Sequence, residues 1–178
     1  MNIEEAQKDM RNAYLGGGSG VLISSLVWLA AGTSAIYTSA QTSFIIFFIG
    51  GMFIHPVGIL IDKLFKRSGK HLKGNPLGNL AMESTIILFV GLYLVYSLFQ
   101  LQPNWLFPIM LMIIGVRYSI FQTIYGMKIY YVLGLILIIA GCLGLNLNQS
   151  FHTFGIIGGL IELLFSIFII QKNKSKSK

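Results

Sequence analysis

The sequence has few charged residues and almost no cysteine. Of its 178 residues, 11% are charged and 54% are hydrophobic, and the mean hydropathy is +0.73. A soluble domain carries about 25% charged residues, so this chain has too little charge to cover a globule in water. Its single cysteine excludes an internal disulfide and a cysteine-based metal cluster. These shortages argue against a soluble protein and favour one that crosses a membrane several times.

Catalytic and metal-binding motifs are also missing. The three histidines, His55, His71 and His152, lie in different segments, and no two have metal-ligand spacing. Neither a Gly-x-Ser-x-Gly elbow nor a cysteine–histidine framework occurs. We therefore expect a protein that is not an enzyme and that has no cofactor and no metal. Two glutamates on different helices leave an intramembrane hydrolase as the alternative.

Six apolar segments reach the length of about 20 residues that a helix needs to cross a bilayer. The expected fold class is all-α, a polytopic transmembrane bundle of six spans that forms one domain over residues 1–178. The expected spans are about 15–37, 42–62, 77–99, 105–126, 129–147 and 152–170.

Basic residues gather on one side of the predicted membrane. All of the 13 lysines and arginines except Arg117 lie in the N-terminal segment, the loop 63–75, Lys128 or the tail 171–178. Because positive loops stay in the cytoplasm, both termini are expected there. The net charge of +7 is thus explained by topology and not by binding to nucleic acid. The tail is expected to be disordered.

The loop 63–75 is the most basic segment between two spans. Apolar side chains alternate with its positive charges, a pattern typical of contact with anionic lipid headgroups. The candidates for that contact are Lys63, Lys66, Arg67, Lys70 and Lys73.

Residues 2–13 are predicted to form a short amphipathic helix. Asn2 and Glu5 have the spacing of a capping box. We expect its apolar face to lie on the bilayer surface, or the segment to be a solvated lead-in. That face holds Ile3, Ala6, Met10 and Ala13.

The second span carries a polar stripe. Gly51, His55, Gly58 and Asp62 share one helical face, which predicts that this face meets protein and not lipid. Pro56 removes one backbone N–H group, so a kink is expected beside His55.

Five ionisable residues are candidates for a binding site inside the membrane: His55, Arg117 and Glu162 at the greatest depth, and Glu83 and Asp62 nearer the cytoplasm. A lone charge there costs at least about 2.5–3.5 kcal/mol, so each needs a partner or water. Our hypothesis is an ion pair of Arg117 with Glu162 or Glu83. Two interpretations stay open, a pair that only holds the helices in register and a site on a substrate or proton path.

Small residues mark helix faces that pack closely. Glycines and serines recur at helical spacing in the first and sixth spans, and these faces also suggest a homodimer. We do not expect an inverted repeat between the two halves of the chain.

Two segments carry a family resemblance. Ile54-His55-Pro56-Val57-Gly58 precedes the basic loop, and the run from Lys73 to Ala81, KGNPLGNLA, opens the third span. Together they resemble a bacterial family of small six-span integral membrane proteins that is known only as a domain of unknown function. The resemblance covers nearly the whole chain and implies a bacterial inner-membrane protein. It implies no activity and no site residue.

Two functions fit these observations. The first is a small permease or ion-coupled transporter with a site between spans two, four and six. The alternative is a non-transporting module, such as a sensor, an accessory subunit or a lipid-interacting protein, whose buried charges only hold the bundle together.

Overall fold

The computed structural model describes residues 1–147 and 149–174, and within them every regular element is a helix. Six helices are long and apolar enough to cross a membrane, which confirms the predicted all-α, multi-pass bundle. In chain order the elements are α1 (Ile3–Ala13), η1 (Leu15–Gly17), α2 (Gly18–Tyr37), α3 (Ala40–Leu64), α4 (Pro76–Phe99), η2 (Pro103–Trp105), α5 (Leu106–Tyr125), α6 (Ile129–Asn146) and α7 (Thr153–Lys174).

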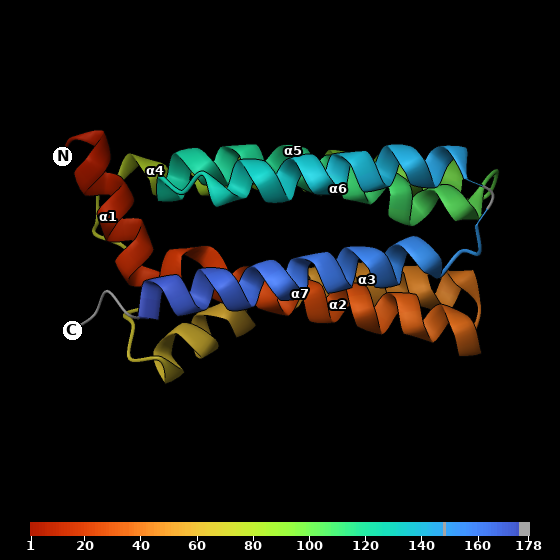
Figure 1. The fold of residues 1–178 in the computed structure, drawn as a ribbon, viewed down its shortest axis with the longest axis horizontal. Coiled ribbons are helices and arrows are strands. Elements are labelled where there is room, and N and C mark those ends of the chain that lie inside the picture. Colours follow the sequence, from red (N-terminus) through yellow and green to blue (C-terminus); the bar gives the residue numbers. More distant parts are fainter. Residues whose placement is uncertain (148, 175–178) are drawn as a thin grey trace.

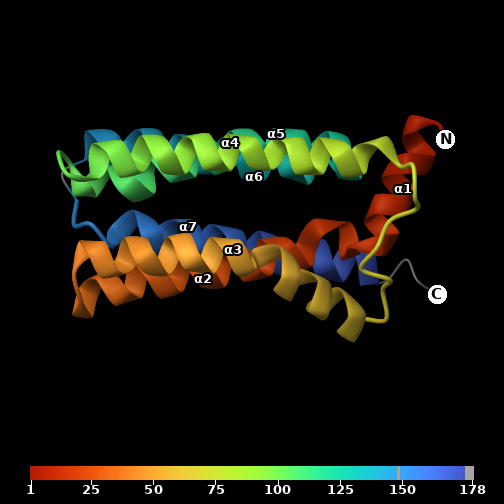
Figure 2. The ribbon, with the colours of Figure 1, turned by 180° about the vertical axis from the view of Figure 1, so that it is seen from behind.

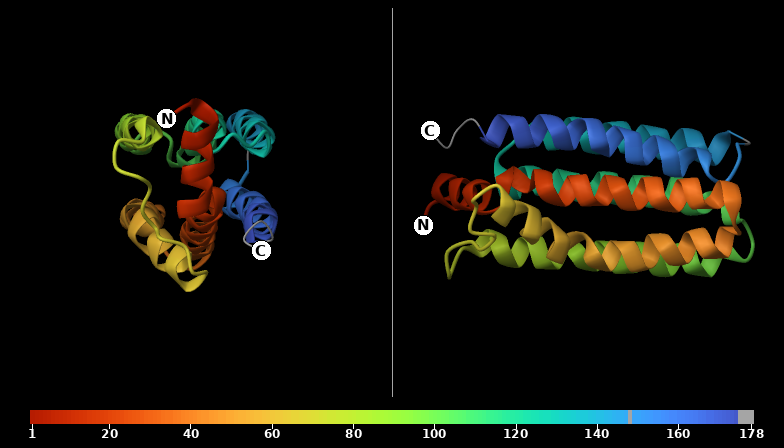
Figure 3. Two further views of the ribbon diagram at one scale, coloured as in Figure 1. Left: turned by 90° about the vertical axis from the view of Figure 1, so that its left-hand side faces the viewer. Right: turned by 90° about the horizontal axis from the view of Figure 1, so that it is seen from below.

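The six long helices form two layers of three (Figures 1 and 3). In one layer α2 lies between α3 and α7, and in the other α5 lies between α4 and α6. Neighbours within a layer run in opposite directions, as short connections require. Large side chains of the two central helices meet between the layers, where the rings of Trp28 and Phe107 lie 5.7 Å apart. The space between α2 and α5 is therefore the middle of the core.

The helix α1 lies across one end of the bundle (Figure 3). Its first turn has the predicted capping box, in which Asn2 and Glu5 each accept a bond from the other's backbone N–H group. Its apolar face packs against the bundle through Ala6, Met10 and Ala13, which are buried. This arrangement differs from both expectations for the segment, because the end of the bundle and not the bilayer covers the face.

We call the end that carries α1 the basic end. The N-terminus, the end of α7, the loop from α3 to α4 and the turn from α5 to α6 lie there (Figures 1 and 2). The loop is tied to α1 by the Tyr14 hydroxyl and His71 Nδ1, 2.8 Å apart, and by bonds from Leu72 N and Asn75 Nδ2 to Asp9. This is the end that the positive-inside rule predicts to face the cytoplasm.

Two glycines allow the sharp turn from α1 into α2. Gly16 and Gly17 have φ angles of 65° and 84°, in the left-handed region that glycine adopts without strain. The Tyr130 hydroxyl of α6 donates to the carbonyl oxygen of Gly16 at 2.6 Å. A Cβ atom on Gly17 would lie 2.6 Å from that same hydroxyl. The glycine cluster before the first span thus serves the chain turn and its contact with α6.

The last helix is longer than the sequence predicted. We expected disorder from residue 171, but α7 continues to Lys174. Asn173 is buried, and its Nδ2 donates to the carbonyl oxygen of Ile169 at 2.8 Å. Arg67 donates to the carbonyl oxygen of Asn173 at 2.7 Å. These bonds hold the final turn in place, and the rest of the predicted tail, residues 175–178, lies outside the described residues.

Pro56 lies inside α3, where a kink was expected. Figure 2 shows the last turns of α3 bending away from the line of its first turns. A proline within a helix removes one backbone hydrogen bond and crowds the preceding turn, which accounts for the bend.

Candidate functional site

A buried glutamate lies between the two layers. Glu162 is on α7 and is 0% exposed. It comes about 14 Å along α7 at 1.5 Å per residue, which is near the middle of a bilayer. The Tyr118 hydroxyl of α5 donates to Glu162 Oε1 at 2.7 Å. The other oxygen, Oε2, is buried and accepts no hydrogen bond of standard geometry among the described residues, and the nearby donor on this side is the buried Ser24 hydroxyl of α2.

The glycine face of α7 brings this carboxyl group into the core. Gly155 approaches the backbone of α2 so closely that an added Cβ atom would lie 3.0 Å from the Cα atom of Gly32. One turn on, a Cβ atom on Gly158 would lie 2.6 Å from Leu111 of α5. Glu162 follows on the same face, with Ser166 buried a further turn along. The missing side chains let α7 sit against both central helices, so Glu162 points between them.

An aromatic cluster covers the centre on the side away from the basic end. Trp28, Phe47, Phe107 and Phe151 make it up, with ring centroids 4.7 Å apart for Trp28 and Phe47 and 5.1 Å apart for Phe107 and Phe151. Along α7, Gly155 touches Phe107 and Gly158 touches Trp28 before Glu162 is reached. We call these four residues the opposite-end aromatic cluster.

A second group of rings covers the centre on the side of the basic end. Tyr118, Phe121, Tyr125 and Tyr130 pack together, and the centroid of Tyr130 lies 5.8 Å from Tyr118 and 5.7 Å from Tyr125. We call these residues the tyrosine cluster. It connects the carboxyl group, through Tyr118, to the turn that begins at Gly126.

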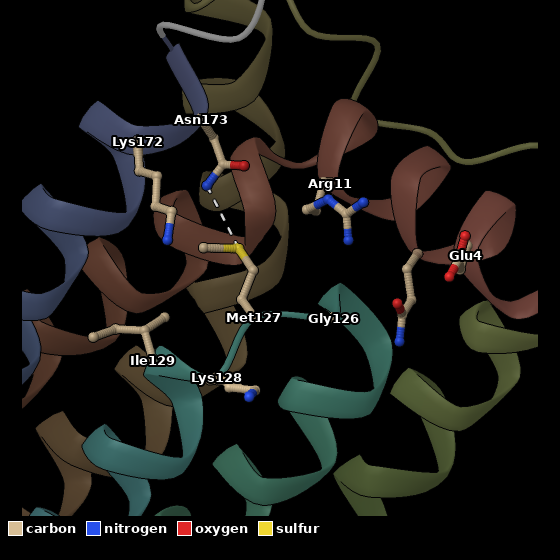
Figure 4. Close-up of a pocket in the computed structure, with 9 residues that line it drawn as sticks. Glu4, Arg11, Gly126, Met127, Lys128, Ile129, Lys172 and Asn173 are labelled. Atoms are coloured by element: carbon tan, nitrogen blue, oxygen red, sulfur yellow. Dashed lines mark hydrogen bonds between the residues drawn. The ribbon is translucent and has the colours of Figure 1, made fainter.

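The bundle has a hollow at each end. The basic-end pocket has a volume of about 510 Å³ (Figure 4), and the opposite-end pocket has about 160 Å³. Neither Glu162 nor any residue of the two ring clusters lines a pocket, so the carboxyl group is not part of either hollow. The basic-end pocket is lined by Glu4, Gln7, Arg11, Gly126, Met127, Lys128, Ile129, Lys172 and Asn173. The opposite-end pocket is lined by Gln102, Asn104, Trp105, Gly144, Leu145, Asn146, Leu147, Gln149, Ser150 and Phe154.

Arg117 does not form the ion pair that we expected. Its Nε donates to Ser84 Oγ of α4 at 3.3 Å, and its guanidinium carbon lies 4.8 Å from the ring centroid of Phe121. Within the described residues no salt bridge joins it to Glu162 or to Glu83. The reason is the helical position, because Arg117 is turned toward α4 while its neighbour Tyr118 is turned toward α7.

The other three candidates lie apart from this centre. His55 and Glu83 are exposed on α3 and α4, so the polar stripe of the second span does not face the core at His55. Asp62 of that stripe is 1% exposed and accepts a bond of 2.6 Å from the Ser19 hydroxyl of α2. The five predicted residues therefore do not form one site, and of the five only Glu162 occupies the middle of the bundle.

The residues proposed for lipid contact lie at the basic end. Lys63, Lys66, Lys70 and Lys73 are exposed, whereas Arg67 is half-buried and bonded to the end of α7. The basic-end pocket uses different cations, Arg11, Lys128 and Lys172.

The sequence contained a signal for Tyr118 that we did not use. Tyr118 shares the weakly polar side of its span with Gly115, Ser119 and Gln122, while Arg117 points away from that side. We selected the charged residue because of its cost in a membrane, and the hydroxyl group next to it is the one that reaches Glu162. The role of α1 in lining a pocket has no such signal, since it depends on how the chain turns at Gly16.

Comparison with known proteins gives a family but no activity. Residues 3–172 match a family described as "Family of unknown function (DUF7010)". No curated protein and no solved structure matches the chain. Within the described residues, no group of three histidine, cysteine or acidic side chains could hold a metal ion.

Proposed function

The chain belongs to this family of unknown function, and we propose that it is a small proton-coupled permease with Glu162 at its centre. The observation that carries the proposal is the unpartnered Oε2 of a fully buried carboxyl group. The working site lies between spans one, four and six, that is α2, α5 and α7, and not between spans two, four and six as the sequence suggested.

A purely structural carboxyl group accounts poorly for this geometry. Leaving a buried acceptor without a donor costs about 1–3 kcal/mol, and more for a charged group. A carboxyl group that only fixed helix register would be expected to have both oxygens bonded, as buried polar groups normally are. Oε2 can be satisfied in two ways, by taking up a proton or by accepting a bond from an entering ligand. A site that alternates between these two partners couples a proton to a ligand.

The two pockets supply the second argument. A transporter must open its centre to one side at a time, and its closed state has a vestibule at each end and a sealed middle. Here the opposite-end aromatic cluster closes one route and the tyrosine cluster closes the other. The proposal identifies this conformation with the closed state of such a cycle. Opening either route requires the aromatic rings of one cluster to change position, while the helices stay intact.

Arg117 has a supporting role in this proposal. It is next to Tyr118 in the chain, and it holds Ser84 of α4. It carries a positive charge one residue from the tyrosine that donates to Glu162. A ligand that lacks a net positive charge is therefore compatible with the centre, because Arg117 offsets Glu162. The proposal includes no catalytic step.

The cellular setting follows from the resemblance and the charge pattern. We place the protein in a bacterial inner membrane with the basic end in the cytoplasm. The exposed lysines of the loop from α3 to α4 are then in reach of anionic headgroups. The glycine faces of α2 and α7 meet each other inside the chain, so a homodimer has to use a different face.

The proposal is tested by ligand-induced thermal stabilisation over a panel of metabolites and ions at several pH values. The protein carries either Glu162→Gln or the matched control Glu83→Gln, which changes an exposed carboxyl group on α4. A permease predicts a ligand whose stabilisation depends on pH, is lost in Glu162→Gln and is kept in Glu83→Gln. The same ligand should drive proton movement in proteoliposomes.

The opposite outcome supports the non-transporting module. In that case no ligand stabilises the protein at any pH, or the stabilising ligands act equally on both variants. Either result contradicts a site at Glu162 and leaves its carboxyl group with a structural role only.

A further inference from the structure

The basic-end pocket brings together three positive side chains from distant parts of the chain. Arg11 comes from α1, Lys128 from the turn before α6 and Lys172 from the last turns of α7, and Glu4 is the one acidic residue of the lining. Figure 4 shows the three cations around the hollow, with Arg11 and Lys172 on different walls. The positive-inside rule explains why this end is basic. It does not explain why three of the charges surround one cavity.

Arg11 is held in place by the end of a helix. Its NH1 donates to the carbonyl oxygen of Tyr125, and Gln7 Nε2 donates to that of Thr123 at 2.8 Å. These bonds satisfy the last carbonyl groups of α5, which have no partner within their own helix. Burial lowers the pKa of Arg11, yet an arginine stays protonated at neutral pH. The pocket therefore has one rigid cation, whose other N–H groups donate to no acceptor among residues 1–147 and 149–174.

The start of α6 forms another part of the wall. Lys128 is the N-cap residue of this 18-residue helix, and no side chain caps its first N–H groups. The N–H groups of Tyr130 and Tyr131 already donate to the carbonyl oxygens of Met127 and Lys128, so this helix end acts on an anion through its partial positive charge. Lys128 and Ile129 line the pocket, so this positive helix end lies beside the three cations. The helix end and the three side chains therefore favour the same kind of ligand, an anion.

We propose that the basic-end pocket is a binding site for a phosphate-type anion. The volume of about 510 Å³ is larger than a phosphate group needs, and it matches the usual size of pockets for small organic ligands. The ligand class is therefore a phosphate monoester or diester, either a soluble metabolite or the headgroup of an anionic lipid. This site shares no residue with the centre at Glu162, and it stands if the proposed transport function fails.

The experiment measures the melting temperature of the full-length protein in two arms. In the soluble arm, inorganic phosphate and pyrophosphate are titrated against chloride of equal ionic strength, with the protein in phosphatidylcholine nanodiscs. In the lipid arm, nanodiscs of phosphatidylcholine with phosphatidylglycerol are compared with phosphatidylcholine alone. Stabilisation in the soluble arm assigns a soluble phosphate ligand, and stabilisation in the lipid arm alone assigns a headgroup.

Matched double variants separate the pocket from general electrostatics. Lys128→Gln with Lys172→Gln removes two pocket charges and keeps Arg11, which is needed for the contact with α5. Lys66→Gln with Lys70→Gln removes the same charge from the exposed loop. Because bonds between a cation and a phosphate are among the stronger polar contacts, the pocket variant should raise the apparent Kd about tenfold or more. The loop variant should change it less than about twofold.

Two results would overturn the proposal. One is an equal loss of affinity for the anion in both double variants, which indicates attraction by the overall positive charge of this end and not a defined site. The other is no stabilisation of the unmodified protein in either arm.

Discussion

The helices α3 and α7 have similar sequence patterns and different surroundings. Each carries glycines and ionisable residues at helical spacing, and each is at the edge of its layer. In the most apolar 18-residue window of each helix, 11% of the residues are buried in α3 and 39% in α7. Gly155 of α7 is in tight contact with Phe107, whereas a Cβ atom on Gly51 of α3 would meet nothing within 4 Å.

The difference comes from the second layer. The helix α7 packs against α5 and α6 of the other layer as well as against α2. The helix α3 meets the other layer through Phe44 and Phe47 in its first turns, and then it bends away after Pro56. A stripe of small and polar residues thus identifies a helix face that packs closely only where a second helix is present to meet it.

The largest effect is expected from filling the glycine face of α7. Gly155→Val should lower the free energy of unfolding by about 3 kcal/mol, because an added side chain collides with Phe107 and with the backbone of Gly32. The matched control is Gly51→Val in α3, which should be within about 0.5 kcal/mol of the unmodified protein. Titration with sodium dodecyl sulfate in mixed micelles measures both. Equal destabilisation by the two changes contradicts the difference between the helices.

A smaller loss is expected from removing the donor to Glu162. Tyr118→Phe removes the one hydrogen bond of standard geometry that the buried carboxyl group accepts, so it should cost about 1–3 kcal/mol. Tyr93→Phe changes an exposed tyrosine of α4 and should have no measurable effect. The same titration compares them. If Tyr118→Phe is as stable as its control, the bond to Glu162 does not form in the membrane protein.

The contact at the end of α3 is expected to contribute about 1 kcal/mol. Ser19→Ala removes the hydroxyl group that donates to Asp62 at 2.6 Å, and Asp62 is nearly fully buried. Ser68→Ala, at an exposed serine of the basic end, is the control. This measurement tests how much the polar end of the α3 stripe adds to stability, apart from the packing of its buried neighbour Gly58 against Gly20 of α2. A neutral Ser19→Ala would show that the bond to Asp62 adds nothing to the stability of the bundle.

The smallest effect is expected at His55. Because this side chain is exposed, His55→Leu should change the free energy of unfolding by less than about 0.5 kcal/mol. A leucine is also compatible with contact to lipid. Ligand stabilisation that depends on Glu162 should persist in this variant. Loss of that stabilisation would show that α3 contributes to the site after all.

The sequence was sufficient for the fold class and for the packed face of α7. Apolar length predicts the six spans, and spacing along α7 predicts its packed face, since both depend on local pattern alone. It was not sufficient for Arg117 and His55, whose partners depend on how the two layers are placed. The cost of a buried charge says that a partner is needed, but it does not say that Ser84 is the partner of Arg117 or that the His55 side of α3 has no partner. The position of α1 depends on the turn at Gly16 and on the long-range bonds that Asp9 accepts from Leu72 and Asn75, which no local pattern contains.

A permease requires that the sealed centre at Glu162 opens to both sides of the membrane. Access of water to this centre can be measured with a single cysteine at Ser166, a small buried residue one turn from Glu162. The one native cysteine is first removed as Cys142→Ser. Ser68→Cys and Ser150→Cys, at exposed positions of the two ends, report which side a membrane-impermeant thiol reagent has reached.

If the protein is a permease, Ser166→Cys should react with the reagent added to either side, at rates that depend on pH and on a stabilising ligand. The reaction should be about 10- to 1,000-fold slower than at the exposed controls, as expected for open states populated at about 0.1–10%. Reaction from neither side, with full reaction after denaturation, would contradict the permease and identify the centre as a permanent part of the core.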